Sequence, residues 1–128
     1  MRGISITRDY APDLPKVMAY GSELNQVWTN LIDNAADAMK NNGELLVRAV
    51  RENEYVLVEI ADNGPGIPPE IQSRIFDPFF TTRGVGEGTG LGLDLVHRIV
   101  QKMRGFVTFN SVPGDTRFHV RIPIHGAL

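Results

Sequence analysis

Two asparagines on one predicted helix are the first side chains whose types and spacing suit chemistry. Asn30 and Asn34 lie four residues apart in SELNQVWTNLIDNAADAMK, so both amides project from one face of that helix. A solvated helix face is the plainer interpretation of this pair. The functional interpretation is a metal site, because an amide oxygen is a hard, neutral ligand for Mg²⁺ when phosphates supply the negative charge.

A carboxylate followed by two glycines forms the second candidate. In ADNGPGI, Asp62 closes a predicted strand and Gly64 and Gly66 follow it. An Asx-type turn capped by Asp62 would account for this pattern. The alternative is a pocket in which Asp62 accepts a hydrogen bond from an exocyclic amine. The two glycines would then let the backbone pass close beside a flat ring.

The glycine-rich stretch GEGTGLGLDLV is the third candidate. Gly86, Gly88, Gly90 and Gly92 alternate directly before a predicted helix. Successive backbone N–H groups at a helix N-terminus favour an anion such as phosphate. A flexible loop would explain the glycines but not their alternation. The stretch has neither the G-x-x-x-x-G-K-[ST] pattern nor a preceding strand of a βαβ unit, so neither a Walker nor a Rossmann phosphate loop is expected.

A small set of elements must hold these residues in place. Hydrophobic periodicity predicts strands at 3–10, 15–20, 44–51, 55–61, 105–111 and 116–124, with a turn at 52–54. It also predicts helices at 22–40, 70–76 and 92–103 and an irregular loop at 77–90. We therefore expect an α+β fold, a two-layer α/β sandwich with a mixed, mostly antiparallel sheet. About three helices should lie on one face, and a long flexible lid should border the site.

Composition sets the class of protein. The 128 residues are 42% hydrophobic and 22% charged, which fits one globular domain spanning 1–128. The net charge of −2 gives no electrostatic reason to expect nucleic acid or an anionic membrane as a partner. The chain has no cysteine, which fits a cytoplasmic location, and no apolar run near the roughly 18 residues of a spanning helix.

The order of the candidate segments is more specific than any one of them. An Asn-rich helix, D-x-G-x-G, F-x-P-F-F and G-x-G-T-G-L-G-L follow one another, and the match runs from about residue 3 to 124. This order resembles the ATP-binding catalytic domain of two-component sensor histidine kinases, where the four segments are the N, G1, F and G2 boxes. The resemblance implies the Bergerat-type fold shared with gyrase, the mismatch-repair ATPases and the heat-shock chaperone ATPase.

For the phosphate end of ATP, the resemblance implies roles for residues of the first and last boxes. Asn34 would be the Mg²⁺ ligand, with Asn30 close to the phosphates. Arg83 stands where these kinases usually carry a lysine, and would contact a phosphate. The lid over the triphosphate would comprise Gly86, Gly88, Thr89, Gly90, Leu91 and Gly92.

For the adenine end, the resemblance implies that Asp62 reads the exocyclic amine, with Gly64 and Gly66 beside it. Thr116 would correspond to the threonine that holds a water near adenine. The local sequence PGDTRF is one residue shorter than the common pattern of these kinases.

One position separates kinases from water-activating ATPases in this superfamily. Gyrase-type ATPases carry a glutamate four residues before the metal-binding asparagine, and here that position is Asn30, which cannot take a proton at neutral pH. General-base help contributes roughly 10²–10⁴ in rate, so we expect slow intrinsic hydrolysis.

The phosphoryl acceptor is expected on another domain. His97, His119 and His125 are the histidines of this chain, and none lies in an acceptor-type helix. Structural roles are expected for His97 and His119. The isolated domain should be a monomer that binds ATP without phosphorylating itself, and a response regulator would be its indirect partner. An anti-sigma-type serine kinase and a non-catalytic nucleotide-binding interaction module stay open as alternatives.

Overall fold

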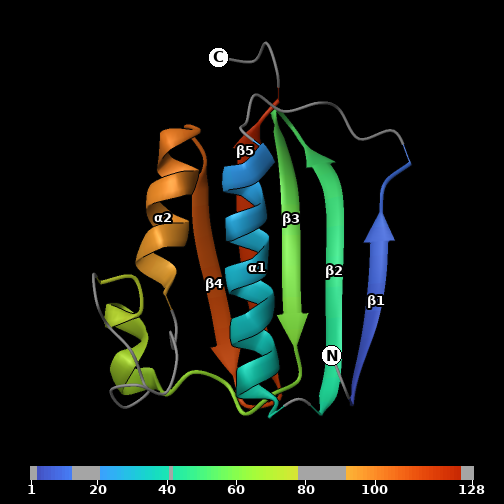
Figure 1. Ribbon diagram of the computed structural model, residues 1–128, viewed down its shortest axis with the longest axis vertical. Coiled ribbons are helices and arrows are strands. Elements are labelled where there is room, and N and C mark those ends of the chain that lie inside the picture. The colour runs from blue at the N-terminus through green and yellow to red at the C-terminus, as the bar shows by residue number, and fades with distance from the viewer. Residues whose placement is uncertain (1–2, 13–20, 41, 78–91, 125–128) are drawn as a thin grey trace.

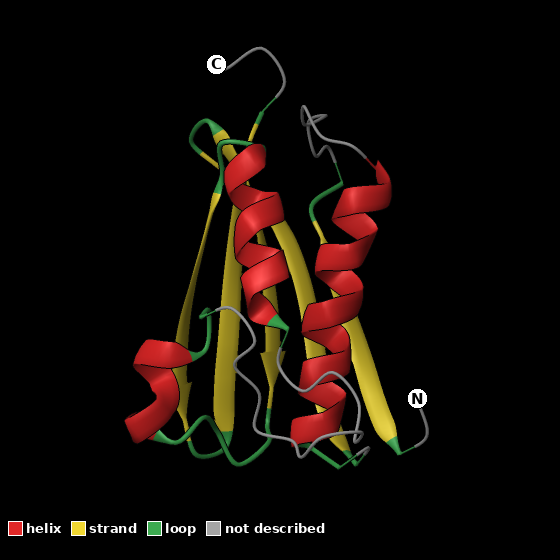
Figure 2. Ribbon diagram, turned by 60° about the vertical axis from the view of Figure 1, so that its left-hand side comes forward, coloured by secondary structure: helices red, strands yellow, loops and turns green. Residues whose placement is uncertain are grey.

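The computed structural model describes residues 3–12, 21–40, 42–77 and 92–124. The described chain forms a sheet with helices against one of its faces, as Figures 1 and 2 show from two directions. The strand expected at 15–20, nearly all of the loop expected at 77–90 and the predicted lid apart from Gly92 lie outside the described residues. No described helix is long and apolar enough to cross a membrane.

The sheet contains five strands in the order β1-β2-β3-β5-β4. Their bounds are β1 Ile4–Tyr10, β2 Gly43–Glu52, β3 Tyr55–Asp62, β4 Phe106–Val112 and β5 Asp115–Pro123. The pair β1–β2 is parallel and the other three pairs are antiparallel. This confirms the mixed, mostly antiparallel sheet. The parallel pair is possible because a helix connects its strands, whereas hairpins connect β2 to β3 and β4 to β5.

Three helices confirm the second layer. They are α1 Gly21–Ala38, α2 Leu93–Lys102 and a short 3₁₀ helix, η1, at Pro69–Arg74. The apolar stripe of α1 is buried against the sheet at Val27, Leu31 and Ala35, as expected from its helical spacing. Together α1 and α2 cover the same face of the sheet (Figure 1). This packing fixes the positions of the residues that α1 carries.

Gly105, between α2 and β4, has room for no side chain. Its N–H donates to the carbonyl oxygen of Val100 at 2.9 Å, and a Cβ there would collide with the carbonyl oxygen of Arg121 in β5. We expect Gly105→Ala to lower the free energy of unfolding by about 3 kcal/mol, at the upper end of the range for overpacking, because a backbone atom cannot rotate away. Urea denaturation measures this.

Gly114→Ala is the matched control for Gly105→Ala. Gly114 has a φ of +86°, which an alanine adopts only with strain, but a Cβ there would meet nothing within 4 Å. Its replacement should cost about 1 kcal/mol. Equal costs for the two substitutions would show that the contact with Arg121 does not matter.

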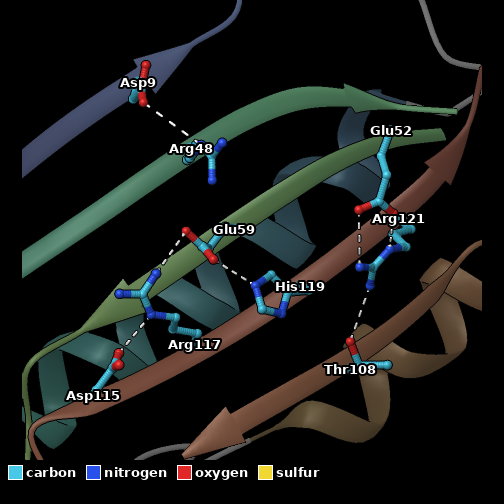
Figure 3. A network of polar contacts seen from close by, with 9 residues as sticks. All are labelled: Asp9, Arg48, Glu52, Glu59, Thr108, Asp115, Arg117, His119 and Arg121. Carbon is cyan, nitrogen blue, oxygen red and sulfur yellow. Dashed lines mark hydrogen bonds and ion pairs between the residues drawn. The ribbon is translucent and has the colours of Figure 1, made fainter.

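The face of the sheet opposite the helices carries a polar network (Figure 3). At its centre, Glu59 of β3 is only 7% exposed, and the His119 ring donates from Nε2 to its Oε2 across 2.7 Å. Arg117 lies 3.4 Å from the other oxygen of Glu59 and also pairs with Asp115 at 2.8 Å. His119 thus has a structural partner in the sheet, in line with the structural role expected for it.

The pKa of Glu59 responds to two opposing influences. Burial raises it, but the hydrogen bond from His119 and the positive charges of Arg117 and His119 outweigh burial, so the pKa lies below its ordinary value of 4.5. A carboxyl group with a lowered pKa stabilises the folded state above its ordinary pKa. That contribution is lost as the pH falls through the folded-state pKa.

Glu59→Gln should therefore flatten the acid side of the stability profile. We expect the wild-type chain to lose more free energy of unfolding than Glu59→Gln between about pH 6 and about pH 3. Urea denaturation at a series of pH values measures this difference. Glu70→Gln, on the exposed side of η1, is the matched control and should keep the wild-type slope. Identical slopes for Glu59→Gln and the wild type would contradict the effect.

Candidate functional site

A narrow cavity of about 50 Å³ lies between α1 and the sheet. Four of the residues singled out in the sequence line it: Asn34 from α1, Asp62 at the end of β3, Gly66 in the following loop and Thr116 from β5. The rest of the lining is apolar and consists of Leu31, Ala35, Ala38, Ile60, Ile67 and Phe118. Three separate segments of the chain thus converge on one hollow, with polar groups in an otherwise hydrocarbon wall.

Asp62 is a buried carboxylate that keeps one oxygen open. Its side chain belongs to a residue only 8% exposed, and Oδ1 accepts the N–H of Gly64 at 2.9 Å. Oδ2 has no hydrogen-bond partner among the described residues. Every fully buried side-chain oxygen of these residues does have a partner, so Oδ2 is not fully buried and retains contact with the cavity or solvent. The Asx-type turn therefore exists and still leaves an acceptor for a ligand.

The surroundings of Asp62 raise the pKa of its carboxyl group. Burial is the main cause, the Gly64 N–H opposes it, and the negative charge of Asp115 adds to it. Burial thus destabilises the ionised form of Asp62. A hydrogen-bond donor that entered the cavity would relieve this destabilisation.

The two glycines after Asp62 have reasons within the protein. A Cβ on Gly64 would lie 3.0 Å from Asp62 Oδ1 and 3.3 Å from Met39 Cγ. Gly66 has a φ of +90°, and its Cβ would lie 2.8 Å from the carbonyl oxygen of Val112. Both residues let this loop pack closely on its neighbours, and Gly66 also lines the cavity. Contact of either glycine with a flat ring stays a prediction.

Thr116 ends a short chain of hydrogen bonds that sequence reasoning missed. The N–H of Ile67 donates to Ser111 Oγ at 2.7 Å, and Ser111 Oγ lies 2.8 Å from Thr116 Oγ1. When Ser111 donates its own proton to Thr116, the Thr116 hydroxyl is left to donate into the cavity. Gln72 of η1 secures the arrangement by donating to the carbonyl oxygen of Ile67 at 2.9 Å.

The register of the β4–β5 hairpin brings Ser111 and Thr116 together. Ser111 is paired with Thr116 across this hairpin, and Thr116 is paired with Asp62 across β3–β5. The turn residues Pro113 and Gly114 in the sequence could have predicted the first of these pairs. Nothing local predicts the second, since β5 lies far from β3 along the chain.

Asn30 and Gly92 meet where α1 passes the start of α2. Asn30 Nδ2 lies 3.4 Å from the carbonyl oxygen of Gly92, and a Cβ on Gly92 would lie 3.0 Å from Asn30 Oδ1. Gly92 is the N-cap residue of α2, with a φ of +57°, and its helix end has no side-chain cap. The last glycine of the G-rich stretch is thus next to the helix that carries Asn34.

The remaining predicted site residues are not placed. Outside the described residues lie Arg83, Gly86, Gly88, Thr89, Gly90 and Leu91, together with His125. His97 lies in α2, and its ring centroid is 5.7 Å from that of Phe76. This packing agrees with the structural role expected for His97.

The donor set agrees with a metal that is held mostly by phosphates. No three His, Asp or Glu side chains gather as a metal cage among the described residues. Asn34 lines the cavity, and its amide group includes an oxygen of the kind that suits Mg²⁺, because this ion keeps several waters and is usually bound by few protein ligands together with substrate phosphates.

The geometry is that of a known class of domain. Residues 20–126 match the family described as "Histidine kinase-, DNA gyrase B-, and HSP90-like ATPase". The chain belongs to this family. It is an ATP-binding catalytic domain of the kind found in two-component sensor histidine kinases, as the resemblance of its four motifs predicts.

Two sensor kinases are among the similar sequences. The chain is 37% identical to the "Sensory histidine kinase/phosphatase NtrB" of Rhodobacter capsulatus, over 93% of this chain and 37% of that protein. It is 36% identical to the "Sensor kinase CckA" of Brucella abortus, over 95% of this chain and 15% of that protein. The chain thus spans well under half the length of either relative.

Two solved structures have the same fold as this chain and match most of its length. The nucleotide-free catalytic domain of histidine kinase ThkA superposes with a TM-score of 0.84 at 30% identity, over 95% of this chain and 81% of that one. The mycobacterial sensor histidine kinase MprB superposes with a TM-score of 0.81 at 29% identity, over 95% and 84%. These matches confirm the α+β fold.

Proposed function

We propose that this domain binds ATP together with Mg²⁺ and donates the γ-phosphoryl group to a histidine on a separate dimerisation domain. The observation that carries the proposal is the meeting of Asn34, Asp62 and Thr116 in one cavity. The protein that contains the domain would act as a sensor histidine kinase in the cytoplasm, with a response regulator as indirect partner. The isolated domain would be a monomer.

Adenine recognition would rest on Asp62 and Thr116. The open oxygen of Asp62 would accept a hydrogen bond from the exocyclic amine. Thr116, held by Ser111, would donate directly or through a water. The cavity of about 50 Å³ is far smaller than the roughly 300 Å³ or more of a typical ligand pocket, so its enclosed part would take only the buried edge of the ring.

The phosphate end would extend along the polar face of α1. Asn34 would hold the metal through its amide oxygen, and the uncapped start of α2 at Gly92 would supply backbone N–H groups to an anion. Arg83 and the glycines from Gly86 to Gly90 would complete this end. When bound, Mg²⁺ would neutralise negative charge on the phosphates during transfer.

Hydrolysis by this domain should be slow. Asn30 stands where a water-activating ATPase has its base, and its amide faces the carbonyl oxygen of Gly92. An amide cannot remove a proton from water, so the roughly 10²–10⁴-fold help of a general base should be missing. Release of inorganic phosphate from ATP by the pure domain measures this, and robust turnover would contradict it.

The proposed function is tested in two stages. Calorimetric titration with ATP and Mg²⁺ comes first, and the loaded domain is then mixed with a separate histidine-bearing dimerisation domain of a sensor kinase. Acid-labile label on that histidine would support the proposal. Stable transfer to serine of a protein substrate would instead indicate the anti-sigma type of kinase. Failure to bind ATP would indicate an interaction module.

A further inference from the structure

A second cavity lies on the helix-bearing face of the sheet, beside a different side of α1. Its volume is about 330 Å³, and the almost fully buried side chains of Leu45 and Ile60 form part of its floor. Ile60 also lines the candidate ATP cavity. In Figure 1, β1 and β2 extend beyond α1, and no helix of the described chain lies in front of them.

The wall of this second cavity is almost entirely hydrocarbon. Trp28 and Ile32 of α1 face Ile6 of β1 across it. Its volume lies within the range of about 300–1,000 Å³ that is typical of small-molecule sites, which are mostly apolar with a few placed polar groups. The size and lining therefore suit a small organic molecule better than a solvated ion.

The polar side chains that line the second cavity are all able to donate hydrogen bonds. Arg8 and Tyr10 line it as exposed residues of β1, and Trp28 adds its indole N–H. Neither the side chain of Arg8 nor that of Trp28 makes a hydrogen bond or ion pair within the described residues. Both groups can only donate, and the described residues of the lining include no carboxylate or amide side chain. The described part of the cavity wall thus offers donors and one positive charge without a negative charge beside them.

We propose that the second cavity binds a small monocarboxylate with an apolar body, such as a medium-chain fatty acid or an arylcarboxylate. The apolar body would pack against Leu45, Ile60 and Trp28, and the carboxylate would lie at Arg8. This inference does not depend on the proposed kinase function, because no residue assigned to metal, adenine or phosphate takes part in it.

Trp28 provides a direct readout, since it is the single tryptophan of the chain. We expect octanoate to change its fluorescence in a saturable way. Arg8→Gln should weaken octanoate binding by about fivefold to tenfold and leave the binding of uncharged 1-octanol unchanged, because only the carboxylate interacts with the guanidinium. Arg98→Gln on the exposed side of α2 is the matched control and should change neither affinity.

Four further outcomes test the proposal. Ala49→Leu fills the floor of the cavity and should abolish binding of both probes in a chain whose ATP affinity and thermal melting show that it is folded. No saturable fluorescence change up to the solubility limit of octanoate would overturn the proposal. So would an equal response of both probes to Arg8→Gln. Direct competition between octanoate and ATP would place octanoate in the other cavity and would overturn it as well.

Discussion

Asp62→Asn should weaken ATP binding by about 100-fold while the fold survives. The substitution removes a charge-assisted hydrogen bond, and it places an NH₂ group where the open oxygen Oδ2 meets the adenine amine, so two donors face each other. The oxygen of the new amide can still accept the N–H of Gly64, which is why the turn should persist. Calorimetric titration with ATP measures the loss.

The same substitution should reverse the preference between nucleotides. GTP and ITP carry an oxygen acceptor at the ring position where ATP carries the amine. The wild-type carboxylate should reject that oxygen, whereas the amide of Asp62→Asn can donate to it. We therefore expect the ratio of ATP to ITP affinity to fall more steeply than the ATP affinity alone. An unchanged ratio would remove Asp62 from the adenine site.

Asp62→Asn should also raise the stability of the nucleotide-free domain at neutral pH. Burial raises the pKa of Asp62 above its ordinary value of 3.8, so the stability that this group contributes is lost as the pH rises through the folded-state pKa. A neutral amide escapes that loss. Thermal denaturation at pH 7 should show a higher Tm, and Asp9→Asn, an exposed residue of β1, should shift neither Tm nor ATP affinity.

A higher Tm together with a weaker ATP affinity in Asp62→Asn would show that Asp62 serves ligand binding at the expense of stability. A residue kept for the fold alone loses stability when it is replaced, as Glu59 should at neutral pH through its pairing with His119. Asp62 should behave in the reverse way, because its proposed partner is the adenine of ATP rather than a group of the protein. A lower Tm for Asp62→Asn would show that the hydrogen bond to Gly64 dominates instead.

The sequence predicts the fold well because the burial pattern of this chain is regular. The stripe of α1 repeats at helical spacing, and β5 alternates between buried residues such as Thr116 and Phe118 and half-buried ones on the opposite face. The predicted and observed bounds of these elements differ by only one or two residues at most ends. The end of β3 at Asp62 rather than Ala61 is one such difference.

The supporting residues of the site were not predictable in the same way. Ser111 and Gln72 matter because β4, β5 and η1 converge behind Thr116, and that convergence depends on the strand order rather than on local sequence. Gly64 and Gly66 show the converse difficulty. The sequence suggests a contact with a flat ring as one reason for these glycines, whereas the structure also gives an internal reason, which is tight packing of Gly64 against Met39 and of Gly66 against Val112.

Asn34→Ala should nearly abolish the Mg²⁺-dependent part of nucleotide binding and lower phosphoryl transfer by about 100-fold or more. Asn34 of α1 lines the same cavity as Asp62 and Thr116. Removal of one metal ligand costs positioning as well as charge stabilisation, and transfer depends chiefly on those two effects. ATP titrations with Mg²⁺ and with EDTA, followed by transfer to an added histidine-bearing domain, measure both.

The control and the rescue variant separate a metal role from a structural one. Asn25→Ala makes the same change on the exposed side of α1, and it should leave binding and transfer unchanged. Asn34→Asp keeps an oxygen ligand and should restore much of the Mg²⁺-dependent binding that Asn34→Ala loses. A merely structural role predicts the opposite order, because a carboxylate in a cavity that already contains Asp62 adds like-charge repulsion. If Asn34→Asp bound ATP more weakly than Asn34→Ala in the presence of Mg²⁺, Asn34 would not be a metal ligand.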